Sequence, residues 1–333
     1  MFPFKIKSAA LVVTKKCNLN CKWCFEEQAG KEMSLPKKEV FRLIEKLRGS
    51  KMLVITGGEP FAREDIREIL AKAASEFEKV HLTTNATLIS KEDIGFLAEK
   101  GISVTASLDG MKKLQERIRG KGTFEKATGT IRAMAESGIK VNLQMTVSKL
   151  NCKDARGVIA LGEEPGAQRV SLLPMKQVGR GSFFEKNCLS KRMRKKMIEK
   201  IYREKRNWKT EVLFKSSFFN LYNNELKEFA STLDEDTICA GCKAGIGGIF
   251  VEWNGDVYPC PFFRVKIGNL FRQELGEIWQ NSPVLNMLRE PGSIKGCSSC
   301  KNWRICRGCR ADALAATGDY LGEDPYCWAR EEK

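Results

Sequence analysis

The stretch AALVVTKKCNLNCKWC, residues 9–24, joins the two features that decide the fold and the chemistry of this chain. It begins with an apolar and β-branched run, AALVVT, which predicts a buried strand. Directly after this strand, Cys17, Cys21 and Cys24 have CxxxCxxC spacing, with no histidine or fourth cysteine close by. Three thiolates can hold three irons of a four-iron cluster and leave one iron open, whereas a structural zinc site takes four protein ligands.

Strands and helices alternate through the first half of the chain. Strands are expected at residues 9–14, 52–56, 80–84, 102–108, 140–147 and 169–175, and helices at 39–49, 64–77, 91–100, 123–137 and 153–162. Strands separated by helices and short loops build a parallel sheet with right-handed crossovers. Because six units are too few for a closed eight-stranded barrel, we expect an α/β fold, a partial (βα)6 TIM-like barrel.

The loops after these strands carry polar motifs. GGEP (57–60), TNAT (84–87) and SLDG (107–110) follow the second, third and fourth strands, as the cysteine loop follows the first. In parallel βα architectures the chemical groups come from the carboxyl ends of the strands. We therefore expect the four loops to meet at one edge of the sheet and to form one site.

Composition and charge narrow the class of protein. The 333 residues include 13 cysteines and carry a formal net charge of +16. No stretch resembles a signal peptide or could span a bilayer, so we expect a cytoplasmic protein that makes no use of a membrane. That compartment keeps thiols reduced, and the clustered cysteines therefore favour metal ligation over disulfides. The charge suggests an acidic partner, although part of it lies at 191–209, where Met193, Met197 and Ile201 predict an amphipathic helix with a solvated basic face.

Beyond residue 175 the alternation of strands and helices is lost. We expect a barrel domain at residues 1–225 and a smaller, cysteine-rich domain at 226–333. In the second domain, IFVEWNGDVYPC (249–260) predicts a β-hairpin around an Asn-Gly turn. Eight thiolates in this part of the chain suffice for two fully ligated four-iron clusters, or equally for two zinc sites of four cysteines each. They are Cys239, Cys242, Cys260, Cys297, Cys300, Cys306, Cys309 and Cys327.

The cysteine loop, GGEP, TNAT and SLDG, in this order and on this βα frame, resemble the motifs of the radical S-adenosylmethionine (SAM) superfamily. The resemblance implies that the open iron of a [4Fe-4S] cluster on Cys17, Cys21 and Cys24 chelates the amine and carboxylate of SAM. An electron from the cluster would then cleave SAM to a 5′-deoxyadenosyl radical, which abstracts hydrogen from a substrate. These three cysteines would thus be catalytic as well as metal ligands.

The same resemblance implies contacts to SAM. Gly57 and Gly58 would let backbone approach the methionyl group, and Glu59 would accept a hydrogen bond from its ammonium. Arg119, in preference to Arg117, would pair with the SAM carboxylate. Phe25 would lie near the adenine of SAM. Hydroxyl and amide groups at the ends of the strands would bind the ribose hydroxyls or the carboxylate of SAM, and they belong to Thr84, Asn85 and Ser107.

The downstream cysteines resemble the SPASM domain, the auxiliary-cluster module of radical SAM maturases. This resemblance implies one auxiliary [4Fe-4S] cluster on Cys239, Cys242, Cys260 and Cys309, and another on Cys297, Cys300, Cys306 and Cys327. One departure is the gap of two residues before Cys309, where three are common. With no open site on either cluster, electron relay is the expected role. The chain would therefore hold three clusters.

The substrate is the least determined part of the expected reaction. Proteins of this kind mostly modify a peptide, a protein or a cofactor precursor, and use an electron donor such as ferredoxin or flavodoxin. The terminal stretch 308–327 resembles the haem-biosynthesis and quinone-cofactor branch, whose haem enzymes remove carboxylates or acetates from an iron tetrapyrrole. The segment 212–229 lacks the Cys and His expected there in the haem branch. An anionic cofactor precursor and an acidic peptide both fit the basic charge.

A third hypothesis comes from another class, a zinc-dependent protein that binds nucleic acid through its basic charge. No aromatic and basic RNA-binding motif supports it, and it leaves the three-cysteine loop before GGEP unexplained. The sole histidine, His81, is expected to pack in or beside the sheet. Cys152 and Cys188 lie outside both patterns and are expected to be buried as small apolar residues. For Cys188, near GRG (179–181) after the sixth strand, a catalytic thiol is the alternative.

Overall fold

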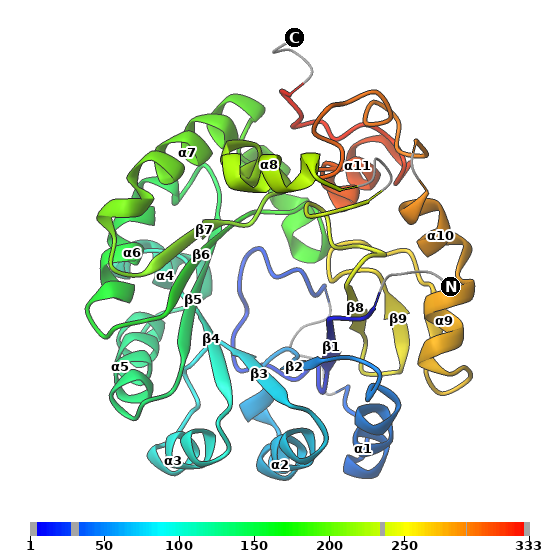
Figure 1. Ribbon diagram of the computed structural model, residues 1–333. Coiled ribbons are helices and arrows are strands. Elements are labelled where there is room, and N and C mark those ends of the chain that lie inside the picture. The colour runs from blue at the N-terminus through cyan, green and yellow to red at the C-terminus, as the bar shows by residue number, and fades with distance from the viewer. Residues whose placement is uncertain (1–4, 28–32, 234–236, 291, 330–333) are drawn as a thin grey trace.

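The computed structural model describes residues 5–27, 33–233, 237–290 and 292–329. Its sheet has ten strands in the order β10-β9-β8-β1-β2-β3-β4-β5-β6-β7, and in Figure 1 they form an open arc. The strands are β1 (Ser8–Val12), β2 (Met52–Thr56), β3 (Lys79–Thr84), β4 (Ser103–Ser107), β5 (Val141–Val147), β6 (Arg169–Pro174), β7 (Glu211–Phe214), β8 (Gly248–Val251), β9 (Asp256–Tyr258) and β10 (Gly268–Asn269).

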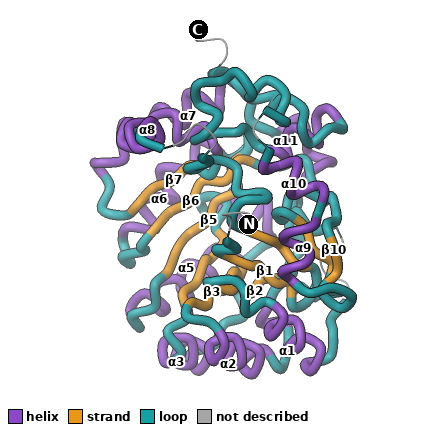
Figure 2. Tube along the Cα trace, turned by 45° about the vertical axis from the view of Figure 1, so that its right-hand side comes forward, coloured by secondary structure: helices purple, strands orange, loops and turns teal. Residues whose placement is uncertain are grey.

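Helices cover the outside of the arc and the far end of the chain (Figures 1 and 2). The crossover helices are α1 (Lys37–Lys46), α2 (Ile66–Glu76), α3 (Lys91–Glu99), α4 (Lys112–Arg119), α5 (Thr123–Glu136), α6 (Ala155–Glu163) and α7 (Lys191–Glu204). The remaining helices are α8 (Asn224–Ser231), α9 (Leu275–Asn281), α10 (Pro283–Arg289) and α11 (Arg310–Thr317). For the residues described, none of these helices combines the length and the apolar character needed to cross a membrane.

The predicted parallel α/β sheet is confirmed, and β1 to β6 coincide with the six expected strands. The structure adds a seventh parallel strand that the sequence analysis missed, with Val212 of β7 opposite Val170 of β6. Only four residues long and set in a basic segment, β7 gives little periodic signal. The amphipathic helix expected before it is α7, which buries Ile198 and Ile201.

The predicted hairpin is also confirmed, because β8 and β9 pair antiparallel around Asn254 and Gly255. Its position is new: β8 pairs parallel with β1, and Ile249 lies opposite Ala9. The cysteine-rich segment thus extends the sheet of the barrel past its first strand. The division at residues 225 and 226 stays a prediction, and one continuous sheet crosses it.

The two faces of the sheet differ in polarity, and this difference creates room for a site. On the helix side, alternate residues such as Leu53, Leu82 and Leu143 are fully buried in the main apolar core. Each such leucine stabilises the fold by about 1.5–3 kcal/mol. The inner face carries many polar side chains instead, among them Gln144 on β5, and it borders a cavity.

His81 lies on this inner face, as packing against the sheet predicted. Its ring nitrogens are 2.7 Å from the hydroxyl oxygens of Ser103 and Thr105 on the neighbouring strand. Burial, reinforced by the charge of Lys215, lowers the pKa of His81 to about 4. His81 is therefore a neutral part of the barrel interior at physiological pH.

Candidate active site

A cavity of about 340 Å³ lies at the carboxyl ends of the strands, where the four motif-bearing loops meet. It is lined by nearly all of the residues that the sequence predicted for the site: Cys17, Cys21, Cys24, Phe25, Gly57, Gly58, Thr84, Asn85, Ser107 and Arg119. Glu59 is the predicted residue that does not line it. The expected convergence of these loops is thus present in the structure, while the roles of the residues remain predictions.

The three cysteines of the β1 loop line this cavity, and N–H groups approach the sulfurs of Cys17 and Cys21. The backbone N–H of Leu19 donates to Cys17 Sγ at 3.4 Å, and Arg119 Nη1 lies 3.9 Å from Cys21 Sγ. Burial raises the pKa of the Cys17 thiol to about 11, which iron binding would overcome by replacing the proton. Three thiols lining one cavity, two of them with N–H groups at their sulfurs, fit an iron–sulfur cluster held by three cysteines.

Glu59 connects the loops after β2 and β3. Its carboxylate is fully buried and accepts hydrogen bonds from Thr84 Oγ1 at 2.8 Å, from Asn85 N at 2.7 Å and from Phe61 N at 3.2 Å. Burial raises its pKa, although these three donors oppose the shift. This carboxylate therefore shapes the TNAT loop, a role that the sequence did not suggest.

The two glycines of GGEP are required by the close approach of the β1 loop. A Cβ on Gly57 would lie 2.5 Å from the carbonyl oxygen of Thr14, and one on Gly58 would lie 2.5 Å from that of Lys16. The N–H of Gly58 donates to Thr14 O at 2.8 Å. Any larger residue would push the cysteine loop away from β2, so these glycines position the cysteines in addition to lining the cavity.

Arg119 is held by a residue that the sequence analysis quoted but did not assign. The Arg119 Nε donates to Asp109 Oδ2 at 2.8 Å, and Asp109 Oδ1 accepts the N–H of Thr146 at 2.7 Å. Asp109 is buried and lies on the cavity wall. The pair aims the guanidinium at Cys21, and the motif SLDG contains the signal that could have identified it.

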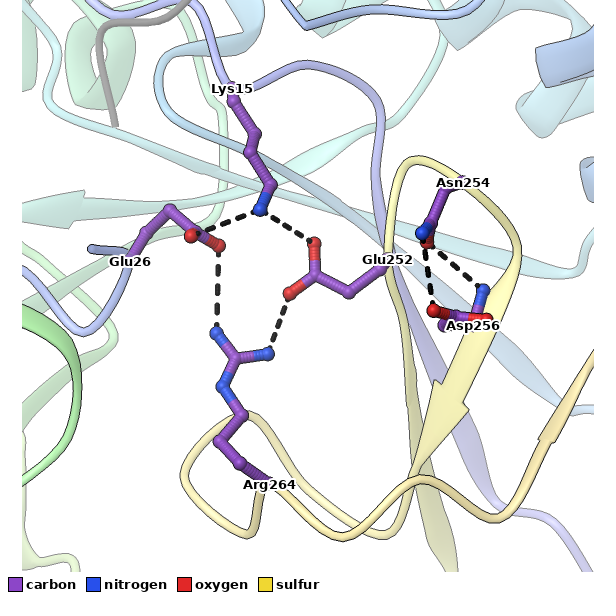
Figure 3. Close-up of polar contacts among 6 residues, drawn as sticks. All are labelled: Lys15, Glu26, Glu252, Asn254, Asp256 and Arg264. Carbon is purple, nitrogen blue, oxygen red and sulfur yellow. Dashed lines mark hydrogen bonds and ion pairs between the residues drawn. The ribbon is translucent and has the colours of Figure 1, made fainter. Parts of the chain in front are cut away.

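A ring of four charged side chains ties the cysteine loop to the hairpin, as Figure 3 shows. Lys15 Nζ lies 3.1 Å from Glu26 Oε1 and 3.8 Å from Glu252 Oε2. Arg264 closes the ring, at 2.6 Å from Glu252 Oε1 and 3.5 Å from Glu26 Oε2. Arg264 also lies over the ring of Phe25, 5.8 Å from its centroid. The aromatic ring predicted to face the adenine is thus fixed from the SPASM side.

The structure brings seven of the eight downstream cysteines together in two groups. Cys297, Cys300, Cys306 and Cys327 line one small cavity, which agrees with the predicted second set. In the other set, Cys260 is within electrostatic range of Cys242 and Cys309, and burial raises its pKa to about 12. The N–H of Cys239 donates to Arg304 O at 2.9 Å. Across the described residues, no three His, Cys, Asp or Glu side chains are arranged for a single metal ion.

Lys176 joins the active-site cavity to the C-terminal segment. Its ammonium lies 2.6 Å from Asp312 Oδ2 on α11 and 3.2 Å from Cys309 Sγ. Arg194 on α7 donates to the same Asp312 oxygen at 2.8 Å. No role was assigned to Lys176 or Arg194 from the sequence, because their partner Asp312 follows more than a hundred residues later in the chain.

The two cysteines outside the motifs differ in burial. Cys188 is buried beside Trp23 and Met175, as expected. Cys152 is only half-buried, so the expectation of full burial was wrong there. It follows β5 at the start of the short 3₁₀ turn Cys152–Asp154, and its thiol lies 3.7 Å from Lys149 O.

Three cysteines at the carboxyl edge of a parallel βα sheet, together with cysteine-rich sites beyond it, define an iron–sulfur enzyme with a partial barrel. Residues 11–158 match the radical SAM superfamily, and residues 239–310 match SPASM, an iron–sulfur cluster-binding domain. The chain therefore belongs to the radical SAM superfamily. It is an enzyme with an iron–sulfur cluster and SAM as cofactors, and the SPASM match favours iron–sulfur clusters over the zinc alternative.

Its relatives act on different substrates. Over 339 residues the chain is 30% identical to the AdoMet-dependent heme synthase of Methanosarcina barkeri, with 96% of each chain covered. It is 28% identical to the mycofactocin maturase MftC of Mycolicibacterium smegmatis, with 95% of this chain and 81% of that protein covered. In structure it resembles SuiB of Streptococcus suis bound to its precursor peptide SuiA, with a TM-score of 0.77, 20% identity, and 97% and 76% of the chains covered.

Proposed function

We propose that this enzyme modifies carboxylate-bearing side chains of an iron tetrapyrrole by SAM-dependent radical chemistry. The observation that carries the proposal is the charge of the active-site cavity. Four cationic side chains line it, Arg119, Lys176, Arg180 and Lys215, against the single carboxylate of Asp109 among the described residues. Full-length similarity to a heme synthase supports the same substrate class.

Cys17, Cys21 and Cys24 would hold the SAM-binding cluster, which when reduced supplies the electron for cleavage of SAM to methionine and the 5′-deoxyadenosyl radical. The protein's own part is positioning. Gly57 and Gly58 keep the cysteine loop against β2. Thr84, Asn85 and Ser107 would bind the hydroxyl groups or the carboxylate of SAM, and Phe25 its adenine.

For the two charged residues, the structure supports different roles. Arg119 presents its guanidinium beside Cys21 and would pair with the SAM carboxylate. Glu59 would hold the loop that carries Asn85, since its oxygens already accept three hydrogen bonds. Whether Glu59 also accepts the SAM ammonium stays a prediction.

The eight SPASM cysteines would hold two auxiliary clusters in the sets given above. Cys309 lies 3.2 Å from the ammonium of Lys176, which also lines the cavity. This contact supports electron transfer between the substrate and an auxiliary cluster as the role of the SPASM domain. The external electron donor would be a small acidic redox protein such as ferredoxin or flavodoxin, which the net charge of +16 would attract.

A precursor peptide is the second candidate substrate. The fold of the chain matches peptide-bound SuiB over 97% of its length, and MftC is a maturase by name. The basic charge would suit an acidic peptide as well as a tetrapyrrole carboxylate. The two candidates differ in which added compound stimulates SAM cleavage.

The test is the release of 5′-deoxyadenosine by anaerobically reconstituted enzyme with SAM and dithionite, with and without iron coproporphyrin, which bears four propionates. Stimulated release together with a lower tetrapyrrole mass is the expected result. The Cys21→Ala variant is the control for release that does not depend on the cluster. Slow release without stimulation or mass change would reject the tetrapyrrole and direct the search to peptides.

A further inference from the structure

Lys215 is a cationic side chain in the active-site cavity that lacks a partner in the described part of the protein. It lines the cavity together with the cysteine loop and the ends of β6. Across residues 5–27, 33–233, 237–290 and 292–329, its ammonium makes no hydrogen bond or ion pair. The side chain is accessible to solvent although protein surrounds it, as expected for a group that projects into a cavity.

The register of β7 determines this position. Val212 and Phe214 are buried on the outer face of the strand, so the alternate residue Lys215 points to the inner face. Its N–H donates to Leu172 O at 2.8 Å, which continues the pairing with β6 beyond the end of β7. The ammonium is therefore directed into the barrel by regular backbone hydrogen bonds.

The other cations of the cavity are already engaged. Arg119 is paired with Asp109, and Lys176 with Asp312. Arg180 donates to the side-chain oxygen of Asn20 in the cysteine loop. Arg180 has only this neutral partner, and its Nε has no hydrogen-bond partner in the described structure. Among the described cations of the cavity, Lys215 is thus the one with neither a hydrogen bond nor an ion pair, and it is available to bind an anionic group that enters from outside.

The surroundings of Lys215 favour such an anion. Its charge, second to burial, lowers the pKa of His81 on the inner face of β3. Burial, with a smaller effect of Arg169, lowers the pKa of Lys215 itself, so a bound carboxylate would stabilise its charged form.

We propose that Lys215 is a specificity-determining residue that binds one carboxylate of the substrate inside the barrel. The inference rests on the proposed tetrapyrrole function and adds a contact directly after β7, which forms an edge of the sheet and lies across the arc from β1 and its cysteine loop (Figure 1). With one carboxylate bound there, the rest of the ring would extend toward the cysteine loop. A neutral analogue would lose this contact.

The test is equilibrium binding of iron coproporphyrin, followed by its visible absorbance, to the reconstituted enzyme in the presence of SAM. Lys215→Met should raise the dissociation constant about 10- to 100-fold, because a hydrogen bond between charged groups is lost. Lys215→Arg should stay within about threefold of the parent, and serves as the second variant if the methionine variant folds poorly. Lys209→Met, which removes a lysine just before β7, is the matched control.

The tetramethyl ester of the same tetrapyrrole should bind the parent and Lys215→Met equally. Equal binding of the free acid to both proteins would overturn the inference and leave the proposed function standing. A variant that loses SAM affinity instead would also overturn it, by showing that Lys215 serves the cofactor. Failure of the parent enzyme to bind or convert the tetrapyrrole would overturn the proposed function, and with it the tetrapyrrole carboxylate as the ligand of Lys215.

Discussion

Replacing Asp312 by asparagine tests the connection between the barrel and the C-terminal segment. Asp312 is buried on α11, and one of its oxygens accepts from both Lys176 and Arg194. Burial alone would raise the pKa of Asp312, but the charges of Lys176 and Arg194 outweigh it and lower that pKa. The amide keeps the shape of the side chain and removes the charge.

The expected loss in free energy of unfolding comes from Lys176 and Arg194, the two cations that stay buried when the carboxylate is removed. Arg194 is 1% exposed, and its Nε and Nη2 already lack hydrogen-bond partners in the described structure. Without the carboxylate, two buried cations face each other near Cys309. Removing one partner of a buried ion pair costs about 3–5 kcal/mol. With a urea slope of about 3 kcal/mol per molar, the unfolding midpoint should fall by about 1 to 1.7 M.

The assay is urea unfolding of the reconstituted enzyme, followed by circular dichroism and by cluster absorbance. Asp319→Asn is the control, since Asp319 on the same segment pairs with the exposed Lys295 and should shift the midpoint very little. A midpoint for Asp312→Asn within error of the control would refute the reasoning. It would mean that water reaches these cations and replaces the carboxylate.

Three further predictions concern the clusters, the barrel interior and the ring in Figure 3. Cys21→Ala should abolish SAM cleavage yet keep roughly two thirds of the iron, measured by iron analysis, because two of three four-iron clusters remain; loss of all iron would contradict separate clusters. The pKa of His81 is about 4 when folded and about 6.5 when unfolded, so its contribution to stability is complete above pH 6.5 and is lost as the pH falls toward 4. His81→Gln should flatten urea stability between these pH values, and an unchanged pH profile would show that the histidine is solvated. Arg264→Met should destabilise the fold by about 1–3 kcal/mol in urea unfolding, because Glu26 and Glu252 then share only Lys15 within the ring; equal stability would show that the ring is dispensable.

Local patterns in the sequence were sufficient to predict most of the secondary structure and the superfamily of this protein. Six strands and their helices follow from apolar periodicity, and the hairpin follows from its Asn-Gly turn. The cysteine spacing and the order of GGEP, TNAT and SLDG identified the superfamily before any contact was known. These features are local because side-chain period, turn chemistry and metal-ligand spacing are each specified within a few residues.

The tertiary structure decided which distant residues meet. It placed β8 beside β1 and added β7, which is too short to give a clear pattern. It showed that Gly57 makes room for the carbonyl of Thr14 rather than only for a ligand.

The pairing of charges also depends on tertiary structure. Lys176 pairs with the carboxylate of Asp312, which lies 136 residues away in the sequence. Lys215 has no such partner in the part of the chain that the structure describes. A basic composition says that cations are present. Only packing determines which of them are neutralised and which one faces an open cavity, because the partner of a buried charge is chosen by three-dimensional proximity and not by sequence distance.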